Sequence, residues 1–316
     1  MFFNVQSDAV RLCGRWHIGE NSAIATAVGC FAEFAFEGRE VLLRFCMQDN
    51  VLPIPHVWIS VDDGLMFEAA LDSSLRVSGF SDGAHVVTVI VKSFEESQSR
   101  WTSPLVAKVE LMGFSAERAG VLPRDDRKVI EFVGDSITEG IAIAPYFDSG
   151  SNNNDVVGTY GWLTAQALGM KPTFSAYGGV GVTAWGCGGV PPAADIYGYN
   201  FADSPTTARA DVVVVNHGAN DRNWKRTAAE YLDGYVALLR EIRRINPKAK
   251  IVVLSAFCGY LPDALREGVE AFNRENNDAV AFVDSKDWIP PEPLHPLYDG
   301  HAIVAEHLTA ELKKIL

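Results

Sequence analysis

The first candidate catalytic residue in this chain is a serine that directly follows an apolar run. Ser136 ends the run Gly134-Asp135-Ser136, directly after the β-branched, apolar residues 128–133. A serine between a buried parallel strand and a helix exposes its hydroxyl at the carboxyl edge of the sheet, where the first amides of the helix also point. The pattern favours a nucleophile, and a plain helix cap is the alternative.

Two later segments carry the groups that such a nucleophile needs. Asn220 follows the valine-rich residues 211–215, and its side-chain amide could donate to a tetrahedral oxyanion; a simple Asn-Asp turn is the alternative. His295 lies between prolines, which is unusual for a core residue, and could serve as general base. Glu292, three residues earlier, could hold the imidazole in the right tautomer. These residues predict acyl-transfer chemistry.

A glycine-rich run at residues 175–183 could add a backbone donor, because glycine lets an N–H approach a substrate closely. Residues 179–184 resemble a dinucleotide fingerprint only weakly, without a clear βαβ context. His295, Asp299 and His301 could be imagined as a metal site, but the proline-flanked loop and the lack of a further convergent ligand argue against it. We expect neither a metal nor a cofactor. His301 and His307 fall on the last expected helix and are interpreted as structural.

The elements that must position these groups change in period along the chain. Short β-rich runs with tight-turn signals at 62–64 and 81–83 predict an antiparallel sandwich in the first part. The runs are 30–36, 41–45, 56–61, 85–91 and 105–111. A polar stretch at 115–127 is interpreted as a linker.

From residue 128 onward, apolar strand-like runs alternate with helical stretches, which predicts a parallel sheet with helices on both faces. The expected strands are 129–133, 211–215, 251–254 and 279–283, and the expected helices are 161–168, 228–245, 264–276 and 300–315. Two long connections, 141–157 and 186–210, should sit above the carboxyl edge of the sheet.

Gly-Asp-Ser at 134–136, the glycine run, Gly-Ala-Asn-Asp at 218–221 and His295-Pro296 occur in the same order as the four blocks of the SGNH (GDSL) hydrolase superfamily, which residues 128–316 resemble. The resemblance implies Ser136 as nucleophile and His295 as base. It also implies an oxyanion hole from the amides of Ser136 and Gly181 and the side chain of Asn220. The family usually has Asp where this chain has Glu292, so Asp287 is a fallback, and some relatives use a Ser-His dyad.

A β-rich first part, a linker and then Ile-Glu-Phe-Val-Gly-Asp-Ser-Ile-Thr also look like carbohydrate esterase family two, and Gly14-Arg15-Trp16 fits that family. The resemblance implies a jelly-roll domain at residues 1–125 and a three-layer α/β/α hydrolase domain at 126–316. It further implies removal of acetyl groups from sugars. Trp185 and Trp224, on loops, could stack on sugar rings, although core positions are equally compatible with such residues.

Composition and charge exclude some classes of binding partner. The formal net charge of −13 and the lack of a Lys/Arg cluster argue against nucleic acid, and no apolar run is long enough for a membrane span. Five scattered cysteines without a Cys-x-x-Cys pair favour free thiols, and the N-terminus does not read as a signal peptide. We therefore expect a cytoplasmic protein that acts on a small-molecule or oligosaccharide ester, with its oligomeric state left open.

Rival functions of two classes remain at this stage. An acyltransferase would use the same residues with a different acceptor, and an esterase could use them on a small ester that is not a sugar. A non-catalytic carbohydrate-binding protein would need the tryptophans but no nucleophile paired with a base. The G-x-S-x-G elbow of α/β-hydrolases is absent from the region of the serine.

Overall fold

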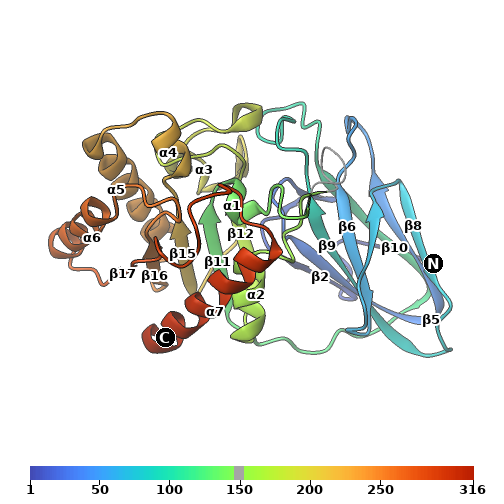
Figure 1. The fold of residues 1–316 in the computed structure, drawn as a ribbon. Coiled ribbons are helices and arrows are strands. Elements are labelled where there is room, and N and C mark those ends of the chain that lie inside the picture. Colours follow the sequence, from blue (N-terminus) through green and yellow to red (C-terminus); the bar gives the residue numbers. More distant parts are fainter. Residues whose placement is uncertain (146–152) are drawn as a thin grey trace.

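The computed structural model describes residues 1–145 and 153–316, so the expected connection 141–157 lies partly outside the described residues. A β-rich first half packs beside an α/β second half (Figure 1). The strand β10 ends at Ala119 and β11 begins at Val129. The boundary predicted between residues 125 and 126 therefore falls in a segment without regular structure.

Ten antiparallel strands of the described residues form the first half, in the order β3-β4-β10-β5-β9-β6-β7, with β1 on β10 and with β2 and β8 on β5. They are β1 (Phe2–Asn4), β2 (Val10–Cys13), β3 (His17–Ile18), β4 (Ala23–Ala25), β5 (Phe31–Cys46), β6 (His56–Val61), β7 (Phe67–Ala70), β8 (Ser74–Ser78), β9 (Ala84–Ser93) and β10 (Val109–Ala119). Asp62 and Asp63 take left-handed φ values of 50° and 56°, as the turn at 62–64 predicts. The predicted sandwich is confirmed.

The strand β5 joins the two layers of this sandwich. Its first part, residues 31–37, pairs with β9, and its second part, 36–46, pairs with β10. The two strands predicted at 30–36 and 41–45 are therefore one. Gly38, with φ 126°, lies between the two predicted runs, and the strand continues through it.

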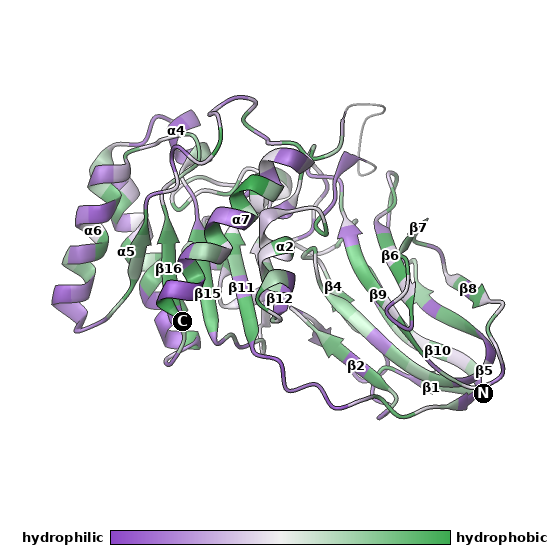
Figure 2. Cartoon of the chain, turned by 60° about the horizontal axis from the view of Figure 1, so that its bottom comes forward, coloured by the Kyte–Doolittle hydropathy of each residue, from purple (hydrophilic) through white to green (hydrophobic). Residues whose placement is uncertain are grey.

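Five parallel strands in the order β12-β11-β15-β16-β17 form the sheet of the second half. They are β11 (Val129–Gly134), β12 (Lys171–Ala176), β15 (Val212–Asn216), β16 (Lys250–Leu254) and β17 (Ala281–Val283). Figure 2 shows β15 and β16 as hydrophobic along their length, as expected for strands covered on both faces. A small hairpin, β13 (Tyr199–Phe201) and β14 (Ser204–Pro205), lies in the connection that follows β12.

The helices form two groups beside this sheet. They are α1 (Ser136–Glu139), α2 (Tyr160–Ala167), α3 (Ala193–Ile196), α4 (Ala219–Asn223), α5 (Ala228–Ile245), α6 (Pro262–Asn276) and α7 (Tyr298–Ile315). The helix α2 packs on α7, and α5 packs on α3 and α6 (Figure 1). Right-handed strand-helix-strand connections place helices on both faces of such a sheet.

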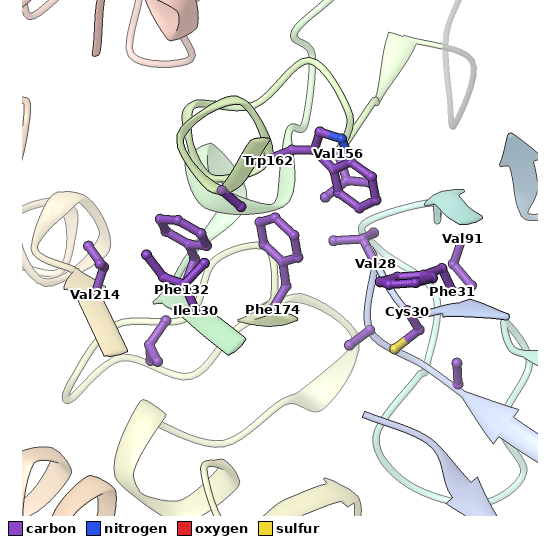
Figure 3. Packing of buried hydrophobic residues seen from close by; sticks show 14 of the residues in the cluster. Val28, Cys30, Phe31, Val91, Ile130, Phe132, Val156, Trp162, Phe174 and Val214 are labelled. Atoms are coloured by element: carbon purple, nitrogen blue, oxygen red, sulfur yellow. The ribbon is translucent and has the colours of Figure 1, made fainter. Parts of the chain in front are cut away.

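An apolar cluster joins the two halves (Figure 3). Phe31 of β5 meets the indole of Trp162 edge to face, with ring centroids 6.3 Å apart, and that indole stacks on Phe174 of β12 at 6.4 Å. A Cβ atom on Gly29 would lie 2.3 Å from the Phe174 ring, so only glycine lets the sandwich backbone approach this closely. The halves thus share one continuous core.

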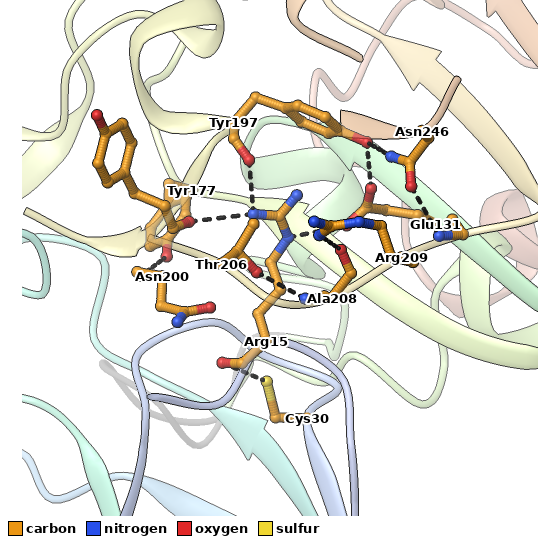
Figure 4. A network of polar contacts seen from close by, with 12 residues as sticks. Arg15, Cys30, Glu131, Tyr177, Tyr197, Asn200, Thr206, Ala208, Arg209 and Asn246 are labelled. Atoms are coloured by element: carbon orange, nitrogen blue, oxygen red, sulfur yellow. Dashed lines mark hydrogen bonds and ion pairs between the residues drawn. The ribbon is translucent and has the colours of Figure 1, made fainter. Parts of the chain in front are cut away.

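A buried ion pair crosses the same junction (Figure 4). Arg15 Nε lies 2.8 Å from Glu131 Oε1 of β11, and both side chains are buried. Arg15 Nη1 also donates to the carbonyl oxygens of Tyr197 and Tyr199, at 2.8 and 3.0 Å. The Tyr197 hydroxyl in turn donates to Glu131. The guanidinium therefore ties the sandwich to the sheet and to the long connection above it.

Candidate active site

Ser136 lies at the turn from β11 into α1, at the carboxyl edge of the parallel sheet. Asp135 caps this helix, because its Oδ1 accepts the Ile137 N–H at 3.0 Å. A Cβ atom on Gly134 would lie 2.0 Å from Thr138 Oγ1, so the sharp turn requires glycine before the cap. The Gly-Asp-Ser run is thus explained by its local packing.

The Ser136 hydroxyl meets an imidazole. Its Oγ lies 2.8 Å from Nε2 of His295, although 159 residues separate the two in sequence. His295 comes from the proline-rich connection between β17 and α7 and is partly buried. Burial lowers the pKa of His295, which favours the neutral imidazole that a general base requires. A serine and a base in this geometry form an activated nucleophile.

The structure does not bring the predicted acid to this histidine. Glu292 and Asp287 are both exposed, and within the described residues neither forms a hydrogen bond or an ion pair with His295. Burial is the cause that lowers the pKa of His295, with no carboxylate opposing it. Over residues 1–145 and 153–316 the arrangement is therefore a Ser-His pair.

Asn220 lies beside the nucleophile turn, at the start of α4. Gly218, with φ 141°, makes the bend that leads from β15 into this helix. Asn220 Nδ2 donates to Val180 O at 3.1 Å and to Asp135 Oδ2 at 3.4 Å. Since Asp135 precedes Ser136 directly, the side-chain amide reaches the region where an oxyanion would form.

Gly181 occupies the neighbouring loop, but its amide is engaged there. The Gly181 N–H donates to Ala184 O at 3.0 Å. A Cβ atom at this position would lie 2.6 Å from the carboxylate of Asp221, which explains the glycine by close packing. As an oxyanion donor, Gly181 would have to share or release its bond to Ala184.

Asp221 is a residue that the sequence reasoning passed over. Its buried carboxylate accepts the Val182 N–H at 3.1 Å, the Thr183 N–H at 2.9 Å and the Thr183 hydroxyl at 2.7 Å. It therefore holds the glycine-rich loop against the segment that carries Asn220. Its place in the run Gly-Ala-Asn-Asp was the signal that could have identified it.

A second buried carboxyl group lies under the site. Burial, opposed by the hydrogen bond from the Ile137 N–H and aided by the nearby carboxyl groups of Asp221 and Glu96, raises the pKa of Asp135 to about 7. Near neutral pH the Asp135 carboxyl group is therefore partly protonated. This limits the negative charge next to Ser136, where an oxyanion would otherwise be repelled.

The remaining predicted residues fall in two groups. Trp185, between β12 and α3, and Trp224, directly after α4, are 60% and 62% exposed, so their rings are free to stack on a ligand. His301 is buried, and its Nδ1 accepts the Tyr160 N–H at 3.1 Å. The ring of His307 stacks on Trp288. The contacts of both histidines are those of structural residues.

In the part of the chain that the structure describes, no group of three or more His, Cys, Asp or Glu side chains could hold a metal ion. None of the helices in residues 1–145 and 153–316 is long and apolar enough to cross a membrane. The five cysteines are free thiols.

Comparison with known proteins gives a family and relatives. Residues 132–310 match the GDSL-like Lipase/Acylhydrolase family. The cellulase/esterase CelE of Acetivibrio thermocellus is 29% identical over an alignment of 276 residues that covers 76% of this chain and 31% of that protein. The acetylxylan esterase/glucomannan deacetylase of Cellvibrio japonicus is 26% identical over 253 residues, 75% of this chain and 68% of that protein. The chain thus spans about 31% of the length of CelE.

A solved structure extends the comparison to the fold. A family two carbohydrate esterase from Cellvibrio japonicus matches with a TM-score of 0.83 at 20% sequence identity, over 100% of this chain and 97% of that one. The similarity therefore includes the sandwich as well as the parallel sheet. It confirms the predicted order of a β-sandwich followed by an α/β/α hydrolase fold.

Proposed function

We propose that the chain, which belongs to the GDSL-like lipase/acylhydrolase family, is a serine esterase that removes short acyl groups, chiefly acetyl, from O-acylated carbohydrates. The observation that carries this proposal is the 2.8 Å contact between Ser136 Oγ and His295 Nε2 at the carboxyl edge of the sheet. A binding protein has no need of a nucleophile paired with a neutral base.

In the proposed first step, Ser136 Oγ attacks the ester carbonyl carbon and its proton passes to His295 Nε2. The Ser136 N–H, which has no partner inside the short helix α1, would donate to the resulting oxyanion. Asn220 would exchange its 3.4 Å bond to Asp135 for a bond to the same oxygen. His295 then gives its proton to the departing sugar oxygen, which leaves an acyl-enzyme and a free hydroxyl.

In the second step, a water molecule loses a proton to His295 and attacks the acyl-enzyme. The same donors stabilise the second oxyanion, and the proton returns to Ser136 Oγ as the carboxylic acid leaves. Without a carboxylate partner, the imidazolium is stabilised less than in a triad, so the Ser-His pair depends strongly on how well it is placed.

The carbohydrate substrate is supported by two observations. The curated relatives carry the names cellulase/esterase and acetylxylan esterase/glucomannan deacetylase. Trp185 and Trp224 present exposed rings on loops that follow β12 and β15, the strands on either side of β11. Aromatic rings on such loops suit the apolar faces of sugar rings.

The test compares purified wild type with Ser136→Ala on 4-nitrophenyl acetate, longer acyl esters and acetylated xylo-oligosaccharides. Ser78→Ala, an exposed serine on β8, is the matched control. We expect Ser136→Ala to fall to the uncatalysed rate while Ser78→Ala keeps the wild-type rate, with acetyl esters preferred. Full activity in Ser136→Ala would overturn the mechanism.

The rival functions give different results in the same assay. If esters react with Ser136 but acetate appears only on an added sugar or alcohol acceptor, the protein is an acyltransferase. If no ester reacts and the tryptophan fluorescence still changes with xylo-oligosaccharides, the protein is a carbohydrate-binding protein.

A further inference from the structure

Asp155 is a buried carboxylate at the point where three parts of the molecule meet, and the proposed mechanism does not use it. Its side chain is 5% exposed. Oδ1 accepts the Trp58 Nε1–H at 2.9 Å and the Val157 N–H at 3.0 Å, and Oδ2 accepts the Tyr298 hydroxyl at 3.0 Å. Two of these three donors, Trp58 and Tyr298, come from distant parts of the chain, so the carboxylate links those parts.

The first segment is the helix that carries the nucleophile. The Asp155 N–H donates to Gly140 O at 3.0 Å, and Gly140 is the C-cap of α1, four residues from Ser136. A Cβ atom on Gly140 would lie 2.4 Å from Asp155 O, so the two backbones are in tight contact. A shift of residue 155 would therefore move the end of α1, the helix that carries Ser136.

The second segment carries the base. Tyr298 is the first residue of α7 and follows His295 by three residues. Its ring packs directly on Gly158, where a Cβ atom would lie 2.2 Å from Cε1, and its hydroxyl reaches Asp155. The proline-rich connection that brings His295 over Ser136 is thus anchored immediately after the histidine.

The third segment is the sandwich. Trp58 belongs to β6, so its indole N–H brings the first half of the chain to the same carboxylate. Neighbours of Asp155 make parallel contacts with β9 and the residue after it. The Val156 N–H donates to Lys92 O at 3.2 Å, and Asn154 Nδ2 donates to Phe94 O at 2.9 Å. The sandwich therefore packs against one side of the segment around Asp155.

We infer that Asp155 is a positioning residue that sets the distance between Ser136 and His295. Its carboxylate fastens the start of α7 to β6, and its backbone N–H fastens the same residue to the end of α1. The inference rests on the proposed function, since it concerns the placement of that nucleophile and base. It assigns the sandwich a share in catalysis that is separate from any contact with substrate.

The conservative variant Asp155→Asn separates placement from charge. An amide oxygen at the Oδ1 position still accepts from Trp58 and Val157, and an amide N–H at the Oδ2 position can donate to the Tyr298 oxygen. All contacts survive although the negative charge is lost. We therefore expect Asp155→Asn to keep kcat within about 3-fold of wild type, with an unchanged pH profile, whereas Asp155→Ala loses roughly 10- to 100-fold, the scale of a misplacement near 1 Å.

Two readouts distinguish positioning from general support of the fold. We expect the loss in Asp155→Ala to fall on kcat for 4-nitrophenyl acetate, with KM within about 2-fold, because substrate contacts are unchanged. The rate of Ser136 labelling by a fluorophosphonate probe should fall by the same factor. Tyr298→Phe, which removes one oxygen atom and should fold, is expected to lose about 10-fold in both rates.

Asp278→Ala is the matched control. It removes a carboxylate that lies 2.7 Å from Arg243 at the opposite edge of the sheet, so it costs a contact without touching the site. Wild-type kcat in both Asp155→Ala and Tyr298→Phe would overturn the inference, as would equal losses in Asp278→Ala. A loss in Asp155→Asn as large as in Asp155→Ala would assign the effect to charge. A wild type inert to esters and probe would instead refute the proposed function, and the inference with it.

Discussion

The ion pair between Arg15 and Glu131 gives the most direct test of how the two halves hold together. Replacing Arg15 with alanine removes the 2.8 Å contact to Glu131 and the donors to two tyrosine carbonyl groups. Glu131 stays buried, with the Tyr197 hydroxyl as its remaining donor among these contacts. The variant therefore leaves the Glu131 carboxylate buried without the cation that pairs with it.

The expected magnitude follows from that burial. Breaking a buried ion pair by removing one partner costs about 3–5 kcal/mol. For a domain of 150–250 residues, each kcal/mol lowers Tm by about 2–4 °C, so Arg15→Ala should lower Tm by roughly 6–20 °C. The pair between Arg76 and Glu40 is the contrast, because both side chains are more than half exposed at 58% and 57%. Arg76→Ala should cost about 1 kcal/mol or less.

Differential scanning calorimetry and urea unfolding of the three proteins measure these costs. A fourth variant, Arg15→Ala with Glu131→Gln, removes the uncompensated charge and should recover part of the loss. If Arg15→Ala is no less stable than Arg76→Ala, or if the added Glu131→Gln recovers nothing, the reasoning from burial is refuted.

Three further outcomes concern the site. Asn220→Ala should lower kcat by about 100-fold or more with a smaller change in KM, because an oxyanion donor acts in the transition state; a loss below 10-fold in steady-state kinetics would exclude that role. Burial lowers the pKa of His295, and the base must be neutral, so kcat/KM should rise with pH through a midpoint below the usual value of about 6.5 and stay high above it; a pH profile with its midpoint above 7 would contradict this. Glu292→Ala should keep kcat within about 3-fold while His295→Ala loses about 100-fold or more, and equal losses in the two variants would restore Glu292 as the acid of a triad.

The second half of the fold follows largely from sequence periodicity, although β12 is not among the expected strands. The helix predicted at 228–245 is α5 at those bounds, because Thr227 and Glu230 form a capping box that marks its start locally. The helix α7 begins at residue 298 instead of 300. Such signals lie within a few residues of the helix end, so sequence reasoning can find them.

The first half could be predicted as a class but not in its pairing. The strand expected at 105–111 is β10, which runs from Val109 to Ala119 and so takes in residues assigned to the linker. Its polar end pairs with β5, where Arg118 lies opposite Glu37. The partners of a strand in a sandwich come from distant sequence, so the local pattern does not mark where the strand ends.

The candidate site divides in the same way. Motif residues such as Ser136, Asn220 and His295 come together because each follows a strand or an anchored loop at one edge of the sheet. The engagement of the Gly181 N–H by Ala184 depends on how its loop closes, which residue order does not reveal. Asp155 is marked by no local signal, since its importance comes from donors more than 90 residues away on either side.

The apolar cluster between the halves also sets an order of events during synthesis. Val28 and Phe31 leave the ribosome well before Trp162 and Phe174, which belong to the same cluster. Because synthesis adds about 5–20 residues per second, this apolar face of the sandwich stays exposed to solvent for several seconds. Arg15 likewise has no ion-pair partner until Glu131 has been synthesised, and Tyr197 follows later still. The nascent sandwich is therefore a vulnerable intermediate, and conditions that slow translation between residues 125 and 174 should increase its capture by chaperones or its aggregation.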